Sequence, residues 1–238
     1  MRNIATMAQR ELGAYFLSPI AYAVAAVFLF SAGLAFGLGT FRNGEESSMR
    51  SLLEWVMLIL VLVLPFLTMR LLSEEFRSGT IESLMTLPIT EVEIVLGKYL
   101  GALAFYVILL VALLVYPIIL SMYGPVDVEL LAANYIGLLL LGALYIAVGL
   151  FFSTCTKHQI ITVLLSVGLL VLLTLAAFYL AQNFDGWPRV VLQQLCIRTH
   201  FVDFVRGVLD VSHVVFFLTM TGLFLFLAVK LLEVRRWQ

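Results

Sequence analysis

Residues 53–93 read LEWVMLILVLVLPFLTMRLL and then SEEFRSGTIESLMTLPITEVE, a long apolar run that ends in a charged island, Ser73–Glu93. A helix needs about 20 apolar residues to cross a hydrocarbon core of roughly 30 Å. Runs of this length recur on both sides of the island. The predicted spans are Ile20–Phe41, Leu53–Leu72, Leu96–Met122, Leu131–Phe152, Ile160–Ala181 and Val211–Leu232. The sequence therefore predicts an all-α integral membrane protein with six transmembrane helices.

Composition supports this class of protein. The 238 residues are 63% hydrophobic and 12% charged, with a mean hydropathy of +1.08, whereas about a quarter of the residues in soluble domains are charged. The strands of an outer-membrane barrel would alternate apolar and polar residues, and these runs do not. The first run, from Ile20, is longer than the roughly 7–15 residues of a signal-peptide core. We therefore expect it to be a retained helix.

The placement of Lys and Arg predicts the orientation. With six spans both termini share one side, and that side carries Arg2, Arg10, Arg70, Arg77, Lys98, Lys157, Lys230, Arg235 and Arg236. The other side carries Arg42, Arg50, Arg189, Arg198 and Arg206. Positive charge favours the cytoplasm, so we expect both termini and the island to be cytoplasmic. The net charge of −1 offers no basic surface for nucleic acid.

Residues 1–18 are predicted to form an amphipathic helix at the inner membrane interface. Its apolar residues recur at helical spacing: Ile4, Met7, Ala8, Leu12, Tyr15 and Phe16. Ser18 and Pro19 then end this helix and begin the next, with Pro19 at the first helical position. The alternative is that residues 1–18 are simply the first turns of the first span.

The island itself predicts two short helices. Gly79 interrupts the first, and Thr80 can cap a second, Ile81–Leu87, that Pro88 ends. Ile81, Leu84 and Met85 share one face of that helix. Thr90 and Glu93 have the spacing of a capping box, which starts the next helix before the membrane. Such a segment suits docking into a cleft on another protein. An ordinary loop explains it equally well, with a solvated acidic face of Glu74, Glu75, Glu82, Glu91 and Glu93.

A resemblance separates these two interpretations. The stretch RLLSEEFRSGTIESLMTLPITEVEIVLGKYLG resembles the signature of the type-2 ATP-binding-cassette (ABC) transporter permeases. In that family this stretch contains the coupling helix, which docks the ATPase subunit. The matching positions here are Glu75, Arg77, Gly79, Thr80, Glu82, Leu84, Leu87, Pro88, Gly97 and Lys98. The resemblance implies that these residues of the island, together with Met85, contact an ABC ATPase.

Further motifs are similar to one subgroup of these permeases. They are RELGAYFLSPIAY (10–22), YIGLLLLGALYIAVGLFFS (135–153), KHQ (157–159) and HFVDFVRGVLD (200–210). Together they resemble the gliding-motility GldF-like permeases, with the NosY-like permeases more distant. The resemblance covers essentially all of residues 1–238 and implies a single permease domain in the bacterial cytoplasmic membrane. It also implies an exporter that pairs with a second copy or a related permease chain, and a GldG-like extracytoplasmic subunit.

Several functional motifs are absent from the sequence. No G-x-x-x-x-G-K-[ST] loop occurs, so ATP and magnesium are expected in the partner subunit and no cofactor in this chain. Cys155 and Cys196 are predicted on opposite sides of the membrane, and the sequence has no metal-ligand spacing. The spans carry few ionisable residues away from their ends, which is atypical of ion-coupled carriers. An intramembrane enzyme is an alternative, but its usual motifs are missing. A non-transporting anchor for an extracytoplasmic machine is a second alternative.

Polar and aromatic residues within and after the spans are candidates for a path or gate. Tyr106, Tyr145 and Thr162 could line a path, or could simply form hydrogen bonds between helices. Residues 182–210 are predicted to form an extracytoplasmic segment with an apolar stripe of Phe201, Phe204, Val205, Val208 and Leu209. The stripe predicts a short helix partly sunk in the outer leaflet, beside membrane lipids. It could act as a gate or dock an extracytoplasmic partner, and the transported substrate stays open.

Overall fold

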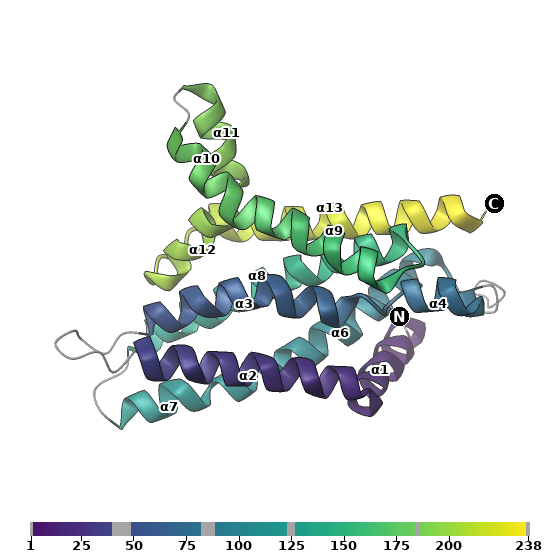
Figure 1. Ribbon diagram of the computed structural model, residues 1–238, viewed down its shortest axis with the longest axis horizontal. Helices are drawn as coiled ribbons and strands as arrows, with labels where there is room; N and C mark the ends of the chain where they lie inside the picture. The colour runs from purple at the N-terminus through teal and green to yellow at the C-terminus, as the bar shows by residue number, and fades with distance from the viewer. Residues whose placement is uncertain (1, 40–48, 82–88, 123–126, 184–185, 237–238) are drawn as a thin grey trace.

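The computed structural model describes residues 2–39, 49–81, 89–122, 127–183 and 186–236, and their regular structure is helical. In chain order the elements are α1 (Arg2–Leu17), α2 (Pro19–Gly39), α3 (Arg50–Thr68), α4 (Ser73–Ser78), α6 (Glu91–Leu113), α7 (Val115–Ser121), α8 (Val128–Cys155), α9 (Gln159–Val171), the π-helical turn η1 (Leu172–Ala176), α10 (Ala177–Asn183), α11 (Trp187–Leu195), α12 (Ile197–Val205) and α13 (Val211–Arg236). Figure 1 shows the long helices side by side, with both termini at the same end as α4.

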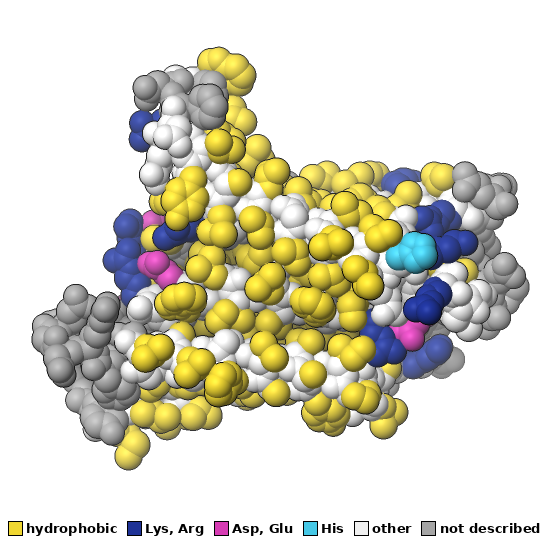
Figure 2. All heavy atoms as spheres, viewed as in Figure 1, with side chains coloured by type: hydrophobic (Ala, Val, Ile, Leu, Met, Phe, Trp, Pro, Cys, Tyr) yellow, Lys and Arg dark blue, Asp and Glu magenta, His cyan; other side chains and the backbone are white. Residues whose placement is uncertain are grey.

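The structure confirms the six predicted spans, with boundaries shifted by a few residues. Helices long and apolar enough to cross a membrane lie at Pro19–Leu38, Arg50–Ser78, Glu91–Ser121, Val128–Cys155, Gln159–Leu180 and Val211–Arg235. Figure 2 shows a broad belt of hydrophobic side chains around the middle of the bundle, with Lys, Arg, Asp and Glu gathered at its two ends. This distribution matches a bundle whose long axis crosses the bilayer.

Helix α8 is the centre of the bundle. It is 67% buried within the single chain and packs against α3, α6, α9, α12 and α13. Membrane helices approach closely where small residues replace large side chains. Three glycines of α8 provide such sites, because Phe204 lies against Gly137, Tyr106 against Gly142 and Thr68 against Gly149. Each glycine therefore receives a side chain from a different neighbouring helix.

The predicted N-terminal helix is present as α1, which ends at Leu17 before Ser18 and Pro19. Its apolar stripe, however, packs against protein. Met7 is buried against Gly97 of α6, and the ring of Tyr15 stacks on Phe105 with centroids 5.1 Å apart. Most of the stripe therefore covers the start of the third span, and the exposed Phe16 at its far end is free to contact lipid.

The part of the chain between the fifth and sixth spans forms a hairpin and a returning helix. The turn η1 interrupts the fifth span, and α10 and α11 then project away from the bundle (Figure 1). Helix α12 returns to α8 and buries Phe201, Phe204 and Val205. The helix ends before Gly207, which has a positive φ of 82°, so Val208 and Leu209 do not extend the predicted stripe and are exposed.

Candidate functional site

The island begins with the short helix α4. Gly79 ends this helix in the left-handed conformation, with φ of 73°, which glycine adopts without strain. Arg77, Gly79 and Thr80 are exposed, whereas Glu75 turns inward. The structure describes the island up to Ile81 and again from Ile89. The other predicted docking residues lie outside the described residues: Glu82, Leu84, Met85, Leu87 and Pro88.

A buried lysine connects α4 with two other helices. Lys98 lies two turns into α6, and its side chain is 2% exposed. Its Nζ donates to Oε1 of Glu11 from α1 at 2.7 Å and lies 2.8 Å from Oε1 of Glu75 in α4. A buried ammonium is costly unless it is paired and hydrogen-bonded. Lys98 therefore fixes the positions of α1 and α4 relative to the third span.

The Lys98 cluster holds more negative than positive charge. Two carboxylates meet one ammonium, and the second oxygen of Glu75, Oε2, is buried without a hydrogen-bond partner among the described residues. Removing Lys98 would leave both carboxylates without their cation. The cluster is therefore sensitive to any change in its one positive charge.

Two glycines allow α1 to approach closely enough for this contact. A Cβ at Gly97 would lie 2.6 Å from Cβ of Met7, and a Cβ at Gly101 would lie 2.7 Å from Cβ of Glu11. Neither distance leaves room for a side chain. Glycine at both positions thus brings the backbones of α1 and α6 together and places Glu11 beside Lys98.

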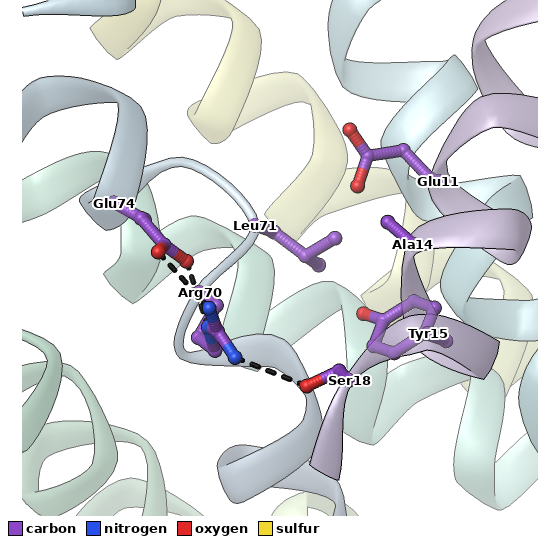
Figure 3. A pocket seen from close by; sticks show the side chains of 7 residues that line it. All are labelled: Glu11, Ala14, Tyr15, Ser18, Arg70, Leu71 and Glu74. Carbon is purple, nitrogen blue, oxygen red and sulfur yellow. Dashed lines mark hydrogen bonds and ion pairs between the residues drawn. The ribbon is translucent and has the colours of Figure 1, made fainter. Parts of the chain in front are cut away.

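A second ion pair joins the end of α3 to α4 (Figure 3). Arg70 donates to both carboxylate oxygens of Glu74, at 2.7 and 3.0 Å, and its third nitrogen donates to Oγ of Ser18 at 3.0 Å. Bidentate pairs of this kind are directional as well as strong. Arg70 therefore ties the turn between α1 and α2 to the start of the island.

A small pocket lies beside this pair. Its volume is about 120 Å³, and it is lined by Glu11, Ala14, Tyr15, Ser18, Arg70, Leu71 and Glu74 (Figure 3). Burial, with the neighbouring Glu11 carboxylate, raises the pKa of Tyr15 far above its usual range. Its hydroxyl stays protonated and donates to the Leu67 carbonyl at 3.2 Å. The pocket wall is thus fixed by hydrogen bonds from α1 to α3.

The turn that leads into α4 is held by α8. Oγ of Ser153 accepts from the backbone N–H groups of Leu72 and Ser73, at 2.9 and 3.0 Å. These N–H groups lie at the start of α4, where a helix has no internal acceptors for them. Ser153 therefore supplies an acceptor from the central helix of the bundle.

The last span holds the other side of α4. The guanidinium of Arg235 lies over the ring of Phe76, 4.6 Å from its centroid, and donates to the carbonyl of Cys155. Phe76 is buried at this contact. Helices α6, α8 and α13 thus contact α4 or its first turn, and α1 is connected to α4 through Lys98.

The capping box at the far end of the island is confirmed. Oγ1 of Thr90 accepts from the N–H of Glu93 at 3.3 Å, and the Glu93 carboxylate accepts from the N–H of Thr90 at 3.2 Å. Nδ2 of Asn3 also donates to Glu93, at 3.4 Å. The start of α6 is therefore held both by its own cap and by α1.

The predicted path and gate residues are buried within the single chain: Tyr106, Tyr145, Thr162, Phe201 and Phe204. Their hydroxyls have partners. Tyr106 donates to the Leu138 carbonyl at 2.7 Å, Tyr145 and Thr174 share a hydrogen bond of 3.1 Å, and Thr162 donates to the His158 carbonyl. Their role in a path stays a prediction.

The residues that anchor α4 were not identified from the sequence as a site. Lys98 and Glu11 are 87 positions apart, and Ser153 is 81 positions from Leu72. Local spacing carries no signal for such contacts. One signal was present in the sequence. Glu11 is the single acidic residue among residues 1–18, and an acidic residue beside an apolar stripe indicates a partner of opposite charge.

These features define a multi-pass α-helical membrane protein in which the second and third spans are joined by an anchored helical segment. A family model described as ABC-2 family transporter protein matches residues 55–186, which is more than half of the chain and includes the island. The chain therefore belongs to the ABC-2 transporter family and is a permease subunit, as the motifs indicated. The family implies an ABC ATPase partner. A search of curated proteins found no match.

Proposed function

We propose that this permease subunit belongs to an ABC exporter and that its island docks the ATPase which drives it. The observation that carries the proposal is the anchoring of α4 by Lys98, Ser153 and Arg235, from three different spans. An ATPase that moves the exposed face of the island would move these spans together, as in a rigid-body transition. ATP and magnesium would be bound by the ATPase and no cofactor by this chain.

The proposed orientation places α4 and both termini in the cytoplasm, in the bacterial inner membrane. Both termini lie at the α4 end of the bundle (Figure 1). The Lys and Arg residues of α1, α4 and the end of α13 gather there, which supports a cytoplasmic location by the positive-inside rule. The hairpin α10–α11 and α12 would then lie at the outer surface.

We also propose that the working unit contains two permease chains, either two copies or this chain with a relative. The first, fifth and sixth spans are only 28%, 33% and 28% buried within one chain. An apolar groove of about 670 Å³ opens between α2 and α3, lined by Ser31, Leu34, Ala35, Leu38, Ser51, Trp55 and Ile59. A second chain facing this groove would enclose a path for an amphipathic substrate.

The finer assignment to the GldF-like subgroup rests on the sequence motifs. It would add a GldG-like accessory subunit outside the membrane. The exposed apolar residues Trp187, Val190 and Val191 of α11 support such a contact, since α11 projects away from the bundle. Copurification with the proteins encoded beside this permease would test that partner directly.

The docking proposal predicts the behaviour of Glu82→Lys. The purified chain alone should hydrolyse no ATP, and the complex with its ATPase should. Reversing the charge at Glu82 should weaken ATPase binding at least about tenfold, because a like-charge or unpaired contact at an interface costs more than about 1.4 kcal/mol. Affinity is measured by titrating labelled ATPase onto the permease in nanodiscs. Glu129→Lys, at the exposed start of α8 on the opposite end, is the matched control. Equal affinity in both variants would reject the island as the docking site.

The capping box predicts a loss of coupling without a loss of docking. Thr90→Ala removes an N-cap and costs about 1 kcal/mol locally, which frays the junction between the island and α6. We expect normal expression and ATPase binding, with less transport per ATP hydrolysed in reconstituted vesicles. Asp127→Ala is the control, because Asp127 is also a side-chain N-cap, at the start of α8 on the opposite end of the bundle. An unchanged ratio in Thr90→Ala would mean that the island is only a tether.

A further inference from the structure

Two histidines meet at the end of the bundle opposite α4. Nδ1 of His200 in α12 lies 2.7 Å from Nδ1 of His213 in α13. Nε2 of His213 lies 3.0 Å from a carboxylate oxygen of Asp203, and Nε2 of His200 lies 3.0 Å from the Gln194 carbonyl. The His200 ring also stacks on Phe216, with centroids 4.0 Å apart. Both rings are therefore held at both nitrogens.

The partners determine where the protons are. A carbonyl can only accept, so Nε2 of His200 carries hydrogen, and Nδ1 of a neutral His200 is then an acceptor. Nδ1 of His213 must therefore donate. The contact between the rings therefore requires that Nδ1 of His200 carries no hydrogen.

We propose that His200, His213 and Asp203 form a proton-sensitive clasp between α12 and α13, which opens when a proton binds to His200. That proton goes to Nδ1 of His200, which is the acceptor of the contact between the rings. Two N–H groups would then face each other at hydrogen-bond distance. The hydrogen bond between the rings is lost, and α12 is free to move from the bundle.

The other charged groups near the site do not replace this contact. On α12, Arg206 lies 3.7 Å from Asp203 and Arg198 pairs with Glu54 of α3. Other titratable groups lie on the remaining elements around α12. They are Asp210 before α13; Asp127, Glu129 and Tyr135 at or near the start of α8; Arg189 of α11; and Cys196 beside η1. Asp210 and Asp127 cap their own helices, Arg189 is exposed, and Cys196 lies against the Thr174 carbonyl of η1. Among the described residues, the polar partners of His213 are His200 and Asp203.

The direction of the pH effect follows from the burial of His200. Burial lowers the pKa of His200 below its ordinary value of 6.5, and the neighbouring His213 lowers it further. The open form therefore binds more protons than the clasped form at pH values below about 6.5. The clasp is intact at neutral and alkaline pH and is lost as the pH falls. For one proton, linkage limits the change in the opening equilibrium to about tenfold per pH unit.

Opening would affect the buried face of α12. Phe201 and Phe204 are fully buried, and Phe204 lies against Gly137 of α8. Their release would uncover the central helix at this end of the bundle. That this end meets an acidic exterior rests on the proposed orientation, whereas the proton dependence of the clasp does not.

The test uses the full-length protein in detergent and two cysteines that it already contains. Cys196 is fully buried directly before α12, and Cys155 is partly buried at the other end of the bundle. We expect the ratio of the Cys196 labelling rate to the Cys155 labelling rate to increase several-fold as the pH falls from about 7.5 to about 5.5. The increase should not exceed the linkage limit of about tenfold per pH unit. In His200→Asn, whose amide oxygen still accepts but does not titrate, the ratio should not rise. A constant ratio in the wild type, or an equal rise in the variant, would overturn the proposal.

A second measurement locates the protons without any variant. The chain has three histidines, His158, His200 and His213, so ¹⁵N imidazole spectra give three resolvable ring systems. At about pH 7.5 we expect the His200 ring to be neutral, with hydrogen on Nε2 and none on Nδ1. The exposed His158 is the internal control. If Nδ1 of His200 does not gain its proton over the pH range in which Cys196 becomes reactive, then opening of the clasp does not cause that reactivity. Neither measurement uses ATPase or transport, so both are independent of the proposed function.

Discussion

Lys98→Met should destabilise the protein by about 3–5 kcal/mol, because removing one partner of a buried ion pair leaves the other charges uncompensated. Here two carboxylates, Glu11 and Glu75, would lose the ammonium that both contact. Methionine keeps the length of the side chain, so the change removes the charge with little loss of volume. We expect a lower melting temperature in detergent and detachment of α1 from α6, measured as faster hydrogen exchange over residues 2–17.

Two controls separate charge from packing at this site. Lys230→Met removes an exposed lysine that pairs with Glu233, and it should cost little. The triple change Lys98→Met, Glu11→Gln and Glu75→Gln removes all three charges and should recover most of the lost stability. If the triple variant were as unstable as Lys98→Met alone, then packing around the lysine stem, and not the ion pair, would hold α1 and α4.

The triple variant also separates stability from coupling. It restores a neutral contact but lacks the directional Nζ hydrogen bond to Glu11 at 2.7 Å and the ion pair with Glu75. If the island transmits force, this variant should fold and bind its ATPase yet transport less per ATP hydrolysed. Wild-type coupling in the triple variant would assign force transmission to Ser153 and Arg235, the other contacts of α4.

The features that the sequence predicted are those that neighbouring residues determine. Each span follows from its own run of apolar residues, and the Thr90–Glu93 capping box follows from a spacing of three. The break at Ser18 and Pro19 follows from the fixed φ of proline. All are present in the structure because no distant contact opposes them.

The features that the sequence did not predict depend on which helices pack together. The apolar stripe of α1 predicted a helix at the membrane interface, whereas Gly97 and Gly101 of α6 let most of that stripe pack against protein. The pairing of His200 with His213 depends on the return of α12 to α13. Hydropathy gives the length of a span but not its neighbours, so the site emerges only from the packed structure.

Gly142→Ala should be a strongly destabilising single-methyl change in the bundle. A Cβ at Gly142 would lie 2.1 Å from Cε1 and 2.3 Å from Cζ of Tyr106. Tyr106 is fully buried, and its hydroxyl donates to the Leu138 carbonyl one turn earlier on α8, so the ring has no free space to enter. Overpacking of this kind costs about 1–3 kcal/mol and occasionally more. We expect a lower melting temperature in detergent and weaker contact between α6 and α8.

The same methyl group added to Gly222 of the last span meets nothing within 4 Å, so Gly222→Ala is a matched control and should be near neutral. Tyr106→Leu removes the end of the ring that a Cβ at Gly142 would strike, at the cost of a small cavity. Combined with Gly142→Ala it should therefore cost less than the sum of the two single changes. Additive costs would show that α6 and α8 do not depend on this close approach. A rescued double variant would show that the tyrosine ring seated on a glycine sets the distance between the third span and the central helix, and thereby the position of Lys98 beneath the island.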